Sequence, residues 1–201
     1  MRVIAGHLGG RRLVAPRGLA TRPTADRVRE ALFSALASVA GARVLDLYAG
    51  TGALGIEALS RGAESAVFVE NARPALAALR ENLTSLGLAS PAAGAPARVL
   101  AEPVARAIPR LATASAERFD LVFVDPPYDD VDAALAALEA LVPALAPRAR
   151  VVLEHAARRP PRPSPVLAVV RTRTYGDTGL TFLTLSSSET SPGDGHEERT
   201  R

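Results

Sequence analysis

A carboxylate, two prolines and an aromatic residue follow one another at Asp125, Pro126, Pro127 and Tyr128. Four apolar residues, LVFV, precede them, so the group begins where a short buried strand is expected to end. Two consecutive prolines do not easily continue a central strand or start a helix, and they therefore fix a stiff turn. The turn presents a carboxylate, a backbone carbonyl and an aromatic ring at one edge of the predicted sheet.

These groups suit a reaction at an exocyclic amine of a nucleobase. Such a nitrogen is a weak nucleophile because its lone pair is delocalised into the ring. The Asp125 carboxylate and the Pro126 carbonyl can each accept one amine hydrogen, which orients the nitrogen and stabilises the positive charge that develops on it. Tyr128 can stack on a base turned out of its helix, a contact worth about 1–3 kcal/mol. Taken alone, the four residues also fit an ordinary rigid turn.

A second chemical feature is the stretch DLYAGTGALG at 46–55, with glycines in the spacing G-x-G-x-x-G. That spacing is typical of loops that hold a dinucleotide pyrophosphate. Asp46, however, would repel a pyrophosphate and suits a cationic ligand such as S-adenosylmethionine, which carries a sulfonium and an ammonium. Glu70 could accept hydrogen bonds from the ribose of either cofactor. The loop alone leaves S-adenosylmethionine, a dinucleotide and a purely structural turn as alternatives.

The elements around these motifs alternate between short apolar runs and helical periods. We expect a hairpin over 2–16 and, at the other end of the chain, two closing strands over 166–175 and 180–185. Between them, strands are predicted at 42–49, 65–70, 97–100, 119–125 and 149–155, and helices at 22–39, 53–61, 73–88, 103–112 and 130–145. This order predicts a Rossmann-like α/β fold with a mostly parallel seven-stranded sheet and an antiparallel closing strand. The carboxyl ends of parallel strands meet at one edge, so both motifs should lie there.

The basic residues of the 201-residue chain are all arginine, and they are unevenly distributed. Residues 1–30 carry seven arginines against two acidic residues, and residues 147–175 carry seven against one. Residues 31–146 carry eight arginines against thirteen acidic residues. Two basic flanks around an acidic centre favour a surface for a polyanion such as nucleic acid.

Several classes of protein are excluded or disfavoured by composition. The chain has no cysteine, which excludes a disulfide framework and thiolate metal sites. No cluster of His, Asp and Glu has metal-ligand spacing, so we expect no metal. The sequence has no apolar run near the ~20 residues of a membrane span and no signal-peptide segment, so a cytoplasmic protein is expected.

With both motifs in order, residues 2–185 resemble the class I S-adenosylmethionine-dependent methyltransferases that modify amines. More narrowly, they resemble the bacterial family that methylates N2 of guanine 966 in 16S rRNA. The stretches that carry the resemblance are RVIAGHLGGRRL, RPTADRVREALF, VLDLYAGTGALGIEALSRGA, FVDPPY and TYGDTGL, of which the second is the most specific to the family. The resemblance implies an enzyme that uses S-adenosylmethionine and acts on 16S rRNA within the assembled or assembling small subunit. Methyl transfer from this cofactor needs no metal, and we expect a monomer.

The resemblance also implies roles for individual residues. Its catalytic turn corresponds to Asp125, Pro126, Pro127 and Tyr128. Its cofactor contacts correspond to Asp46, Tyr48, Gly50, Thr51, Gly52, Glu70, Asn71 and Glu102. Its RNA contacts correspond to Arg11, Arg12, Arg22, Arg27 and Arg29. One departure concerns the third strand, where many such enzymes have a small Asp or Asn against the adenine; here Glu102 or a backbone group must serve.

The resemblance divides residues 1–185 into an RNA-facing part over 1–40 and a methyltransferase domain over 41–185. The polar, low-complexity composition of 186–201 predicts a disordered tail. Two alternative functions remain. An adenine-N6 DNA or RNA methyltransferase shares the Asp-Pro-Pro-Tyr turn, although the chain has no large insertion between the motifs for reading a DNA sequence. A noncatalytic RNA-binding protein could keep the same fold.

Overall fold

The computed structural model describes residues 1–16, 23–89, 95–114 and 118–186, with only the backbone described at 23–25 and 128. Its strands are β1 (Arg43–Leu47), β2 (Ser65–Glu70), β3 (Ala97–Ala101), β4 (Phe119–Val124), β5 (Leu145–Ala156), β6 (Leu167–Tyr175) and β7 (Thr178–Leu185). Its α-helices are α1 (Pro23–Leu36), α2 (Ala53–Ser60), α3 (Arg73–Ser85), α4 (Val104–Thr113) and α5 (Val131–Leu141). Short 3-10 turns are formed by η1 (Tyr128–Asp130) and η2 (Val142–Ala144).

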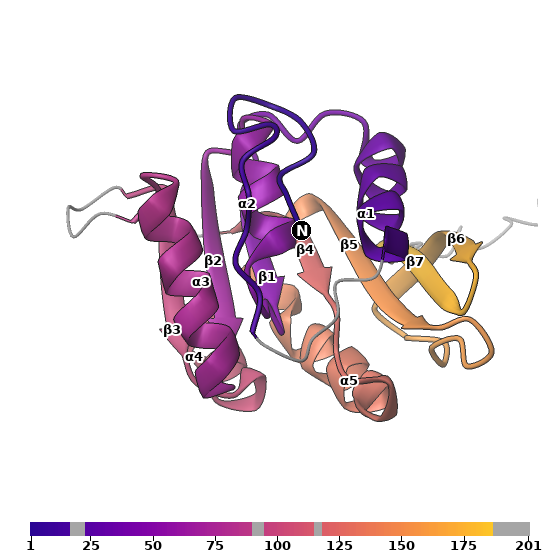
Figure 1. Ribbon diagram of the computed structural model, residues 1–201. Coiled ribbons are helices and arrows are strands. Elements are labelled where there is room, and N and C mark those ends of the chain that lie inside the picture. Colours follow the sequence, from indigo (N-terminus) through magenta and orange to yellow (C-terminus); the bar gives the residue numbers. More distant parts are fainter. Residues whose placement is uncertain (17–22, 90–94, 115–117, 187–201) are drawn as a thin grey trace, which may run out of the picture.

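Within the described residues the strands form one seven-stranded sheet in the order β3-β2-β1-β4-β5-β7-β6 (Figure 1). The first five strands in this order are parallel, whereas β7 runs antiparallel to both β5 and β6. The chain builds outward from β1 to β3 and then returns to place β4 on the other side of β1. The order therefore reverses between β1 and β4, which is where α/β sheets place their ligands. The predicted Rossmann-like fold with an antiparallel strand is confirmed.

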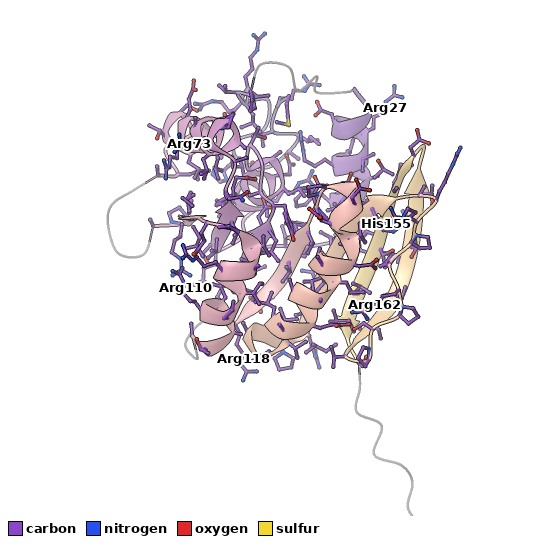
Figure 2. The ribbon with its side chains drawn as sticks, turned by 90° about the horizontal axis from the view of Figure 1, so that it is seen from below. Arg27, Arg73, Arg110, Arg118, His155 and Arg162 are labelled. Carbon is purple, nitrogen blue, oxygen red and sulfur yellow. The ribbon has the colours of Figure 1, made fainter. Side chains whose placement is uncertain are left out.

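Helices cover both faces of the sheet because side chains of the buried strands alternate between two apolar cores. One core contains α1, α2 and α3, and in it Phe33 of α1 packs against Phe123 of β4 with ring centroids 5.6 Å apart. The other core contains α4 and α5, with Ile108 and Leu138 fully buried. Figure 2 shows Arg27 on the α1 side and Arg110 on the opposite, α4 side.

The N-terminal segment folds back on itself as predicted over 2–16, but it forms only a minimal antiparallel hairpin. One bridge joins Arg2 and Arg12, and three backbone hydrogen bonds of 2.9–3.1 Å connect the two arms. Glu57 of α2 accepts hydrogen bonds from two successive backbone N–H groups of the segment, at 2.7 and 3.0 Å. Because Glu57 accepts from the N–H groups of Ile4 and Ala5, the pairing of the two arms does not extend further.

The helix predicted over 130–145 is shorter in the structure, since α5 ends at Leu141. Pro143 has no backbone N–H to donate into a continuing α-helix, and one 3-10 turn follows instead. Strand β5 then begins at Leu145, earlier than predicted. At the start of the β4–β5 pair the register shifts between Phe119 and Leu121, which accommodates the extra length of β5.

Residues 1–40 share a core with the rest of the fold. Val3 and Leu13 of the N-terminal segment belong to the same apolar cluster as Val44 and Phe68 of the sheet. The functional division at residue 40 therefore stays a prediction. The predicted tail lies outside the described residues from 187 onward. None of the described helices is long and apolar enough to span a membrane.

Candidate active site at the carboxyl edge of the sheet

The two predicted motifs meet at the carboxyl ends of β1 and β4. Leu47 pairs with Val124, and the backbone N–H of Asp125 lies 3.4 Å from the carbonyl oxygen of Leu47. In Figure 1 the arrowheads of β1, β2 and β4 point to this edge, and Figure 2 is viewed from that side. The loop after β1 and the turn after β4 are therefore adjacent.

Four acidic residues gather on one face of the sheet at this edge. Each lies two positions after a strand residue that packs under α1, α2 and α3, so strand alternation places all four on that face. They are Glu70 of β2, Asp46 of β1, Asp125 just after β4 and Glu154 of β5. Glu154 is not predicted from the sequence, because one acid within an apolar strand resembles any half-buried strand position. Only the pairing of β4 with β5 would have indicated its place beside Asp125.

The glycines of the loop after β1 have distinct structural reasons. Gly50 and Gly52 adopt φ values of +58° and +81°, in the left-handed region that favours glycine. A Cβ on Gly55 would lie 2.3 Å from Phe68, so Gly55 is needed for packing. A Cβ on Gly50 would meet nothing nearer than 4.0 Å, which leaves the backbone at Gly50 open to a ligand.

Asp46 is buried, with only 1% of its surface exposed. Its Oδ2 accepts a hydrogen bond from the N–H of Gly55 at 2.9 Å. Burial raises the pKa of Asp46 well above its ordinary value, and the charges of Asp125 and Glu70 raise it further. Because three carboxylates interact here, a cation bound at this edge would be strongly favoured.

Glu70 fixes the loop to the end of β2. Its Oε2 accepts a hydrogen bond from the N–H of Gly50 at 2.8 Å. Its Oε1 accepts from the N–H groups of Asn71 and Ala72, at 2.8 and 2.7 Å. With these bonds Glu70 holds Gly50 in place, and its contact with a cofactor ribose stays a prediction.

The turn after β4 is stiff, as the two prolines predict. Pro126 is buried, Pro127 is exposed, and the N–H of Asp130 donates to the Pro127 carbonyl at 2.8 Å. Tyr128 begins the 3-10 turn, and the position of its ring lies outside what the structure describes. Asp125 keeps solvent-exposed surface, yet desolvation by the protein around its carboxylate raises its pKa to about 6.

The other predicted cofactor residues differ in their exposure and in the contacts that they already make. Tyr48 is half-buried, and burial together with the charge of Asp130 raises the pKa of its hydroxyl. The carbonyl of Thr51 accepts a hydrogen bond from Asn82 of α3 at 3.0 Å. Asn71 is exposed. The remaining candidate is Glu102, which forms an ion pair with Arg110 at 2.6 Å.

The predicted RNA contacts separate into surface and internal residues. Arg12 and Arg27 are exposed, and Arg11 is exposed while donating to the Ser85 carbonyl at 2.9 Å. Arg29 is only 4% exposed and donates to the carbonyl of Arg2 and to Asp26. Its guanidinium is therefore bound inside the fold, and the RNA role predicted for it is wrong. Arg22 lies outside the described residues.

The edge as a whole is rich in hydrogen-bond acceptors and negative charge. It can hold a positively charged ligand and, at the turn after β4, orient a group that donates through N–H. Among the described residues, no group of three or more His, Asp or Glu side chains could hold a metal ion. His155, next to Glu154, is buried with both ring nitrogens bonded, to the Ala156 carbonyl and the Thr181 hydroxyl, and so does not supply acid–base chemistry.

Comparison with known proteins finds relatives that are named as methyltransferases. The chain is 39% identical over 189 residues to "Putative rRNA methyltransferase YlbH" of Bacillus subtilis, covering 90% of this chain and 96% of that protein. It is 40% identical over 129 residues to "Ribosomal RNA small subunit methyltransferase D" of Escherichia coli, covering 64% of this chain and 60% of that protein. The solved structure of "Putative methyltransferase yhhF from Escherichia coli" superposes with a TM-score of 0.75 at 30% identity, covering 93% and 98% of the two chains.

The profile of one protein family matches nearly the whole described chain, over residues 1–184. That span includes both motifs, the N-terminal segment and all seven strands of the sheet except the last residue of β7. The chain therefore belongs to the family described as Conserved hypothetical protein 95.

Proposed function

We propose that this protein transfers a methyl group from S-adenosylmethionine to the N2 amine of a guanine in 16S rRNA. Guanine 966 is the position that the resemblance of its motifs indicates. The observation that supports the reaction is the adjacency of two acceptor sites at one edge. Asp46 lies where a cationic cofactor would bind, and Asp125 lies beside it in a turn suited to an amine.

The residues after β1 fit S-adenosylmethionine better than a dinucleotide. A pyrophosphate would add negative charge next to Asp46, whose pKa burial and neighbouring carboxylates already raise. A sulfonium and an ammonium would instead relieve that repulsion. Asp46 and the open backbone at Gly50 would hold the cofactor, with Glu70 as the acceptor for its ribose. S-adenosylmethionine supplies an electrophilic methyl carbon when it is bound.

The turn after β4 would prepare the amine. The Asp125 carboxylate and the Pro126 carbonyl accept its two hydrogens, so the nitrogen lone pair is directed away from them and toward the cofactor site. The nitrogen must lose one proton when it gains a methyl group. Asp125, whose pKa is raised to about 6, can accept that proton and release it to water, since its carboxylate keeps solvent contact.

The N-terminal segment and α1 would form the RNA surface. Arg12 and Arg27 are exposed there, and beside them lies a hollow of about 530 Å³ whose lining includes Arg2, Asp26 and Arg27. The names of the two rRNA methyltransferases to which the chain is similar support an rRNA substrate. We propose that the substrate is the small subunit during or after assembly, and that the protein acts as a monomer in the cytoplasm.

Small subunits from cells that lack the gene provide the test. Incubated with the purified protein and S-adenosylmethionine, they should gain one N2-methylguanosine, identified by mass spectrometry of the nucleosides from digested 16S rRNA. Formation of N6-methyladenosine would refute the guanine assignment in favour of an adenine enzyme. Cofactor binding without methylation of any RNA would instead indicate a noncatalytic RNA-binding protein.

A further inference from the structure

Glu154 lies beside the proposed catalytic carboxylate. In the parallel pair of β4 and β5, Val124 pairs with Leu153, so the next residues along the two strands, Asp125 and Glu154, are neighbours. Both side chains lie on the sheet face that α1 covers, as the burial of Val152 two positions earlier in that core indicates. Glu154 is partly exposed, so a ligand at this edge can reach it.

The surrounding fold does not use Glu154 as a structural contact. No hydrogen bond or ion pair reaches its carboxylate from the residues that the structure describes. The junction of β5 with β7 is secured by the next residue, His155, whose Nε2 lies 2.9 Å from the Thr181 hydroxyl. Burial and the charge of Asp125 raise the pKa of Glu154 to about 8. A desolvated carboxylate without a partner is stabilised by an N–H donor that a ligand supplies.

Guanine offers such a donor next to the amine that would react. Its N1–H lies beside the N2 amine, so the base presents adjacent donors along one edge. Adenine and cytosine have a ring-nitrogen acceptor beside their amine instead. If Asp125 and the Pro126 carbonyl accept the two amine hydrogens, an acceptor beside Asp125 is placed for the ring N–H. The same acceptor would repel the ring nitrogen of adenine.

We propose that Glu154 selects guanine by accepting a hydrogen bond from its N1–H. The inference rests on the proposed function and adds to it a residue that determines the base. Glu154 takes no part in the bonds that form and break. It binds guanine so that the N2 amine lies at Asp125. When adenine is bound instead, the carboxylate of Glu154 is left without a hydrogen-bond donor.

The test compares two purines at the target position. Small subunits are reconstituted with 16S rRNA carrying either guanine or 2-aminopurine, which keeps the 2-amine but has a ring acceptor in place of N1–H. Single-turnover methyl transfer is measured above pH 8, where Glu154 is ionised. The proteins are the wild type, Glu154→Gln, Glu154→Asp and a control, Glu81→Gln, at an exposed position on α3.

The wild type and the control should prefer guanine by roughly tenfold to a hundredfold, as one hydrogen bond to a charged group predicts. Glu154→Gln should lose roughly that factor on guanine but not on 2-aminopurine, because its amide can donate to the ring nitrogen. Glu154→Asp keeps the charge and should keep part of the preference. Cofactor affinity by calorimetry should be unchanged in both variants, and neither variant should melt below the wild type.

A Glu154→Gln variant that slows both purines equally, with its preference unchanged, would overturn this role for Glu154 while leaving the proposed function intact. A wild type that methylates neither purine would overturn the proposed function and this inference with it. If Glu154→Gln fails to fold, the two-purine ratios of the wild type and Glu154→Asp decide the question. A wild type without preference for guanine then contradicts the inference.

Discussion

This fold buries acidic side chains in two regions. One holds Glu57 on α2, and the other holds the carboxylates at the carboxyl edge of the sheet. Glu57 is fully buried, and its oxygens accept from the N–H groups of Ile4 and Ala5 and from Arg61 Nε at 2.7 Å. The guanidinium of Arg29 lies nearby, with Nε 3.9 Å from Glu57 Oε2. Both carboxylate oxygens of Glu57 thus accept hydrogen bonds from the protein itself.

At the carboxyl edge Glu70 accepts from three backbone N–H groups, but the matching of the other three acids is incomplete. Asp46 has one backbone donor and faces two other carboxylates, and burial raises the pKa values of Asp46, Asp125 and Glu154. This difference distinguishes buried acids that stabilise the fold from buried acids that are available to bind a ligand. An acid that the fold has fully paired stabilises the fold, whereas an acid left short of donors costs stability and is available for binding.

Removing Glu57 should give the largest effect on stability. Glu57→Ala leaves buried Arg29 with Asp26 as its remaining carboxylate, and it leaves two backbone N–H groups of the N-terminal segment without their acceptor. The free energy of unfolding, measured with urea, should fall by about 3–5 kcal/mol. Glu81→Ala, at an exposed position, serves as the control. A loss below about 1 kcal/mol would mean that Glu57 is not the architectural acid that its contacts indicate.

Removing Asp125 should change turnover and leave the fold intact. Asp125→Ala should lower the rate of methyl transfer by about 10²–10³, the usual cost of one group that stabilises developing charge. Affinity for S-adenosylmethionine, measured by calorimetry, should be retained. Asp129→Ala in the same turn is the matched control, since its side chain is 98% exposed. Unchanged turnover in Asp125→Ala would remove this residue from the proposed mechanism.

The smallest effect, and one of opposite sign, is expected at Asp46. Because its pKa is raised in the folded protein, the native state binds the proton more tightly than the unfolded chain does. Wild-type stability from this group is therefore present at low pH and is lost as pH rises through the raised pKa. The Asp46→Asn variant has no such loss. Without cofactor it should therefore melt about 2–4 °C higher than the wild type at alkaline pH, which corresponds to roughly 1 kcal/mol in the free energy of unfolding.

Scanning calorimetry at two pH values checks this prediction. The difference between Asp46→Asn and the wild type should shrink at a pH near 4, and the variant should bind S-adenosylmethionine more weakly at alkaline pH, where wild-type Asp46 is charged. A variant that melts lower than the wild type at alkaline pH would show that Asp46 stabilises the free protein. The proposed contrast between the acids at the carboxyl edge and Glu57 would then be wrong.

Much of the fold could be predicted from the sequence because its signals are local. The strand over 65–70 is found as predicted, and the glycines after β1 marked the loop. The features that were missed depend on contacts between distant segments. Glu57 takes N–H groups that a longer hairpin would use, Arg29 turns inward to meet it, and Glu154 reaches the site only through the register of β4 and β5.

Asn82 of α3 joins the N-terminal segment to the cofactor loop through three hydrogen bonds. Its Oδ1 accepts from the N–H of Val14 at 2.7 Å, and its Nδ2 donates to the carbonyls of Val14 and Thr51. An aspartate could replace the acceptor but neither donor, a leucine could replace none, and a glutamine would displace the amide by a methylene group. Few substitutions at this fully buried position would therefore be tolerated during evolution, although its immediate neighbour Glu81 is free to vary on the surface.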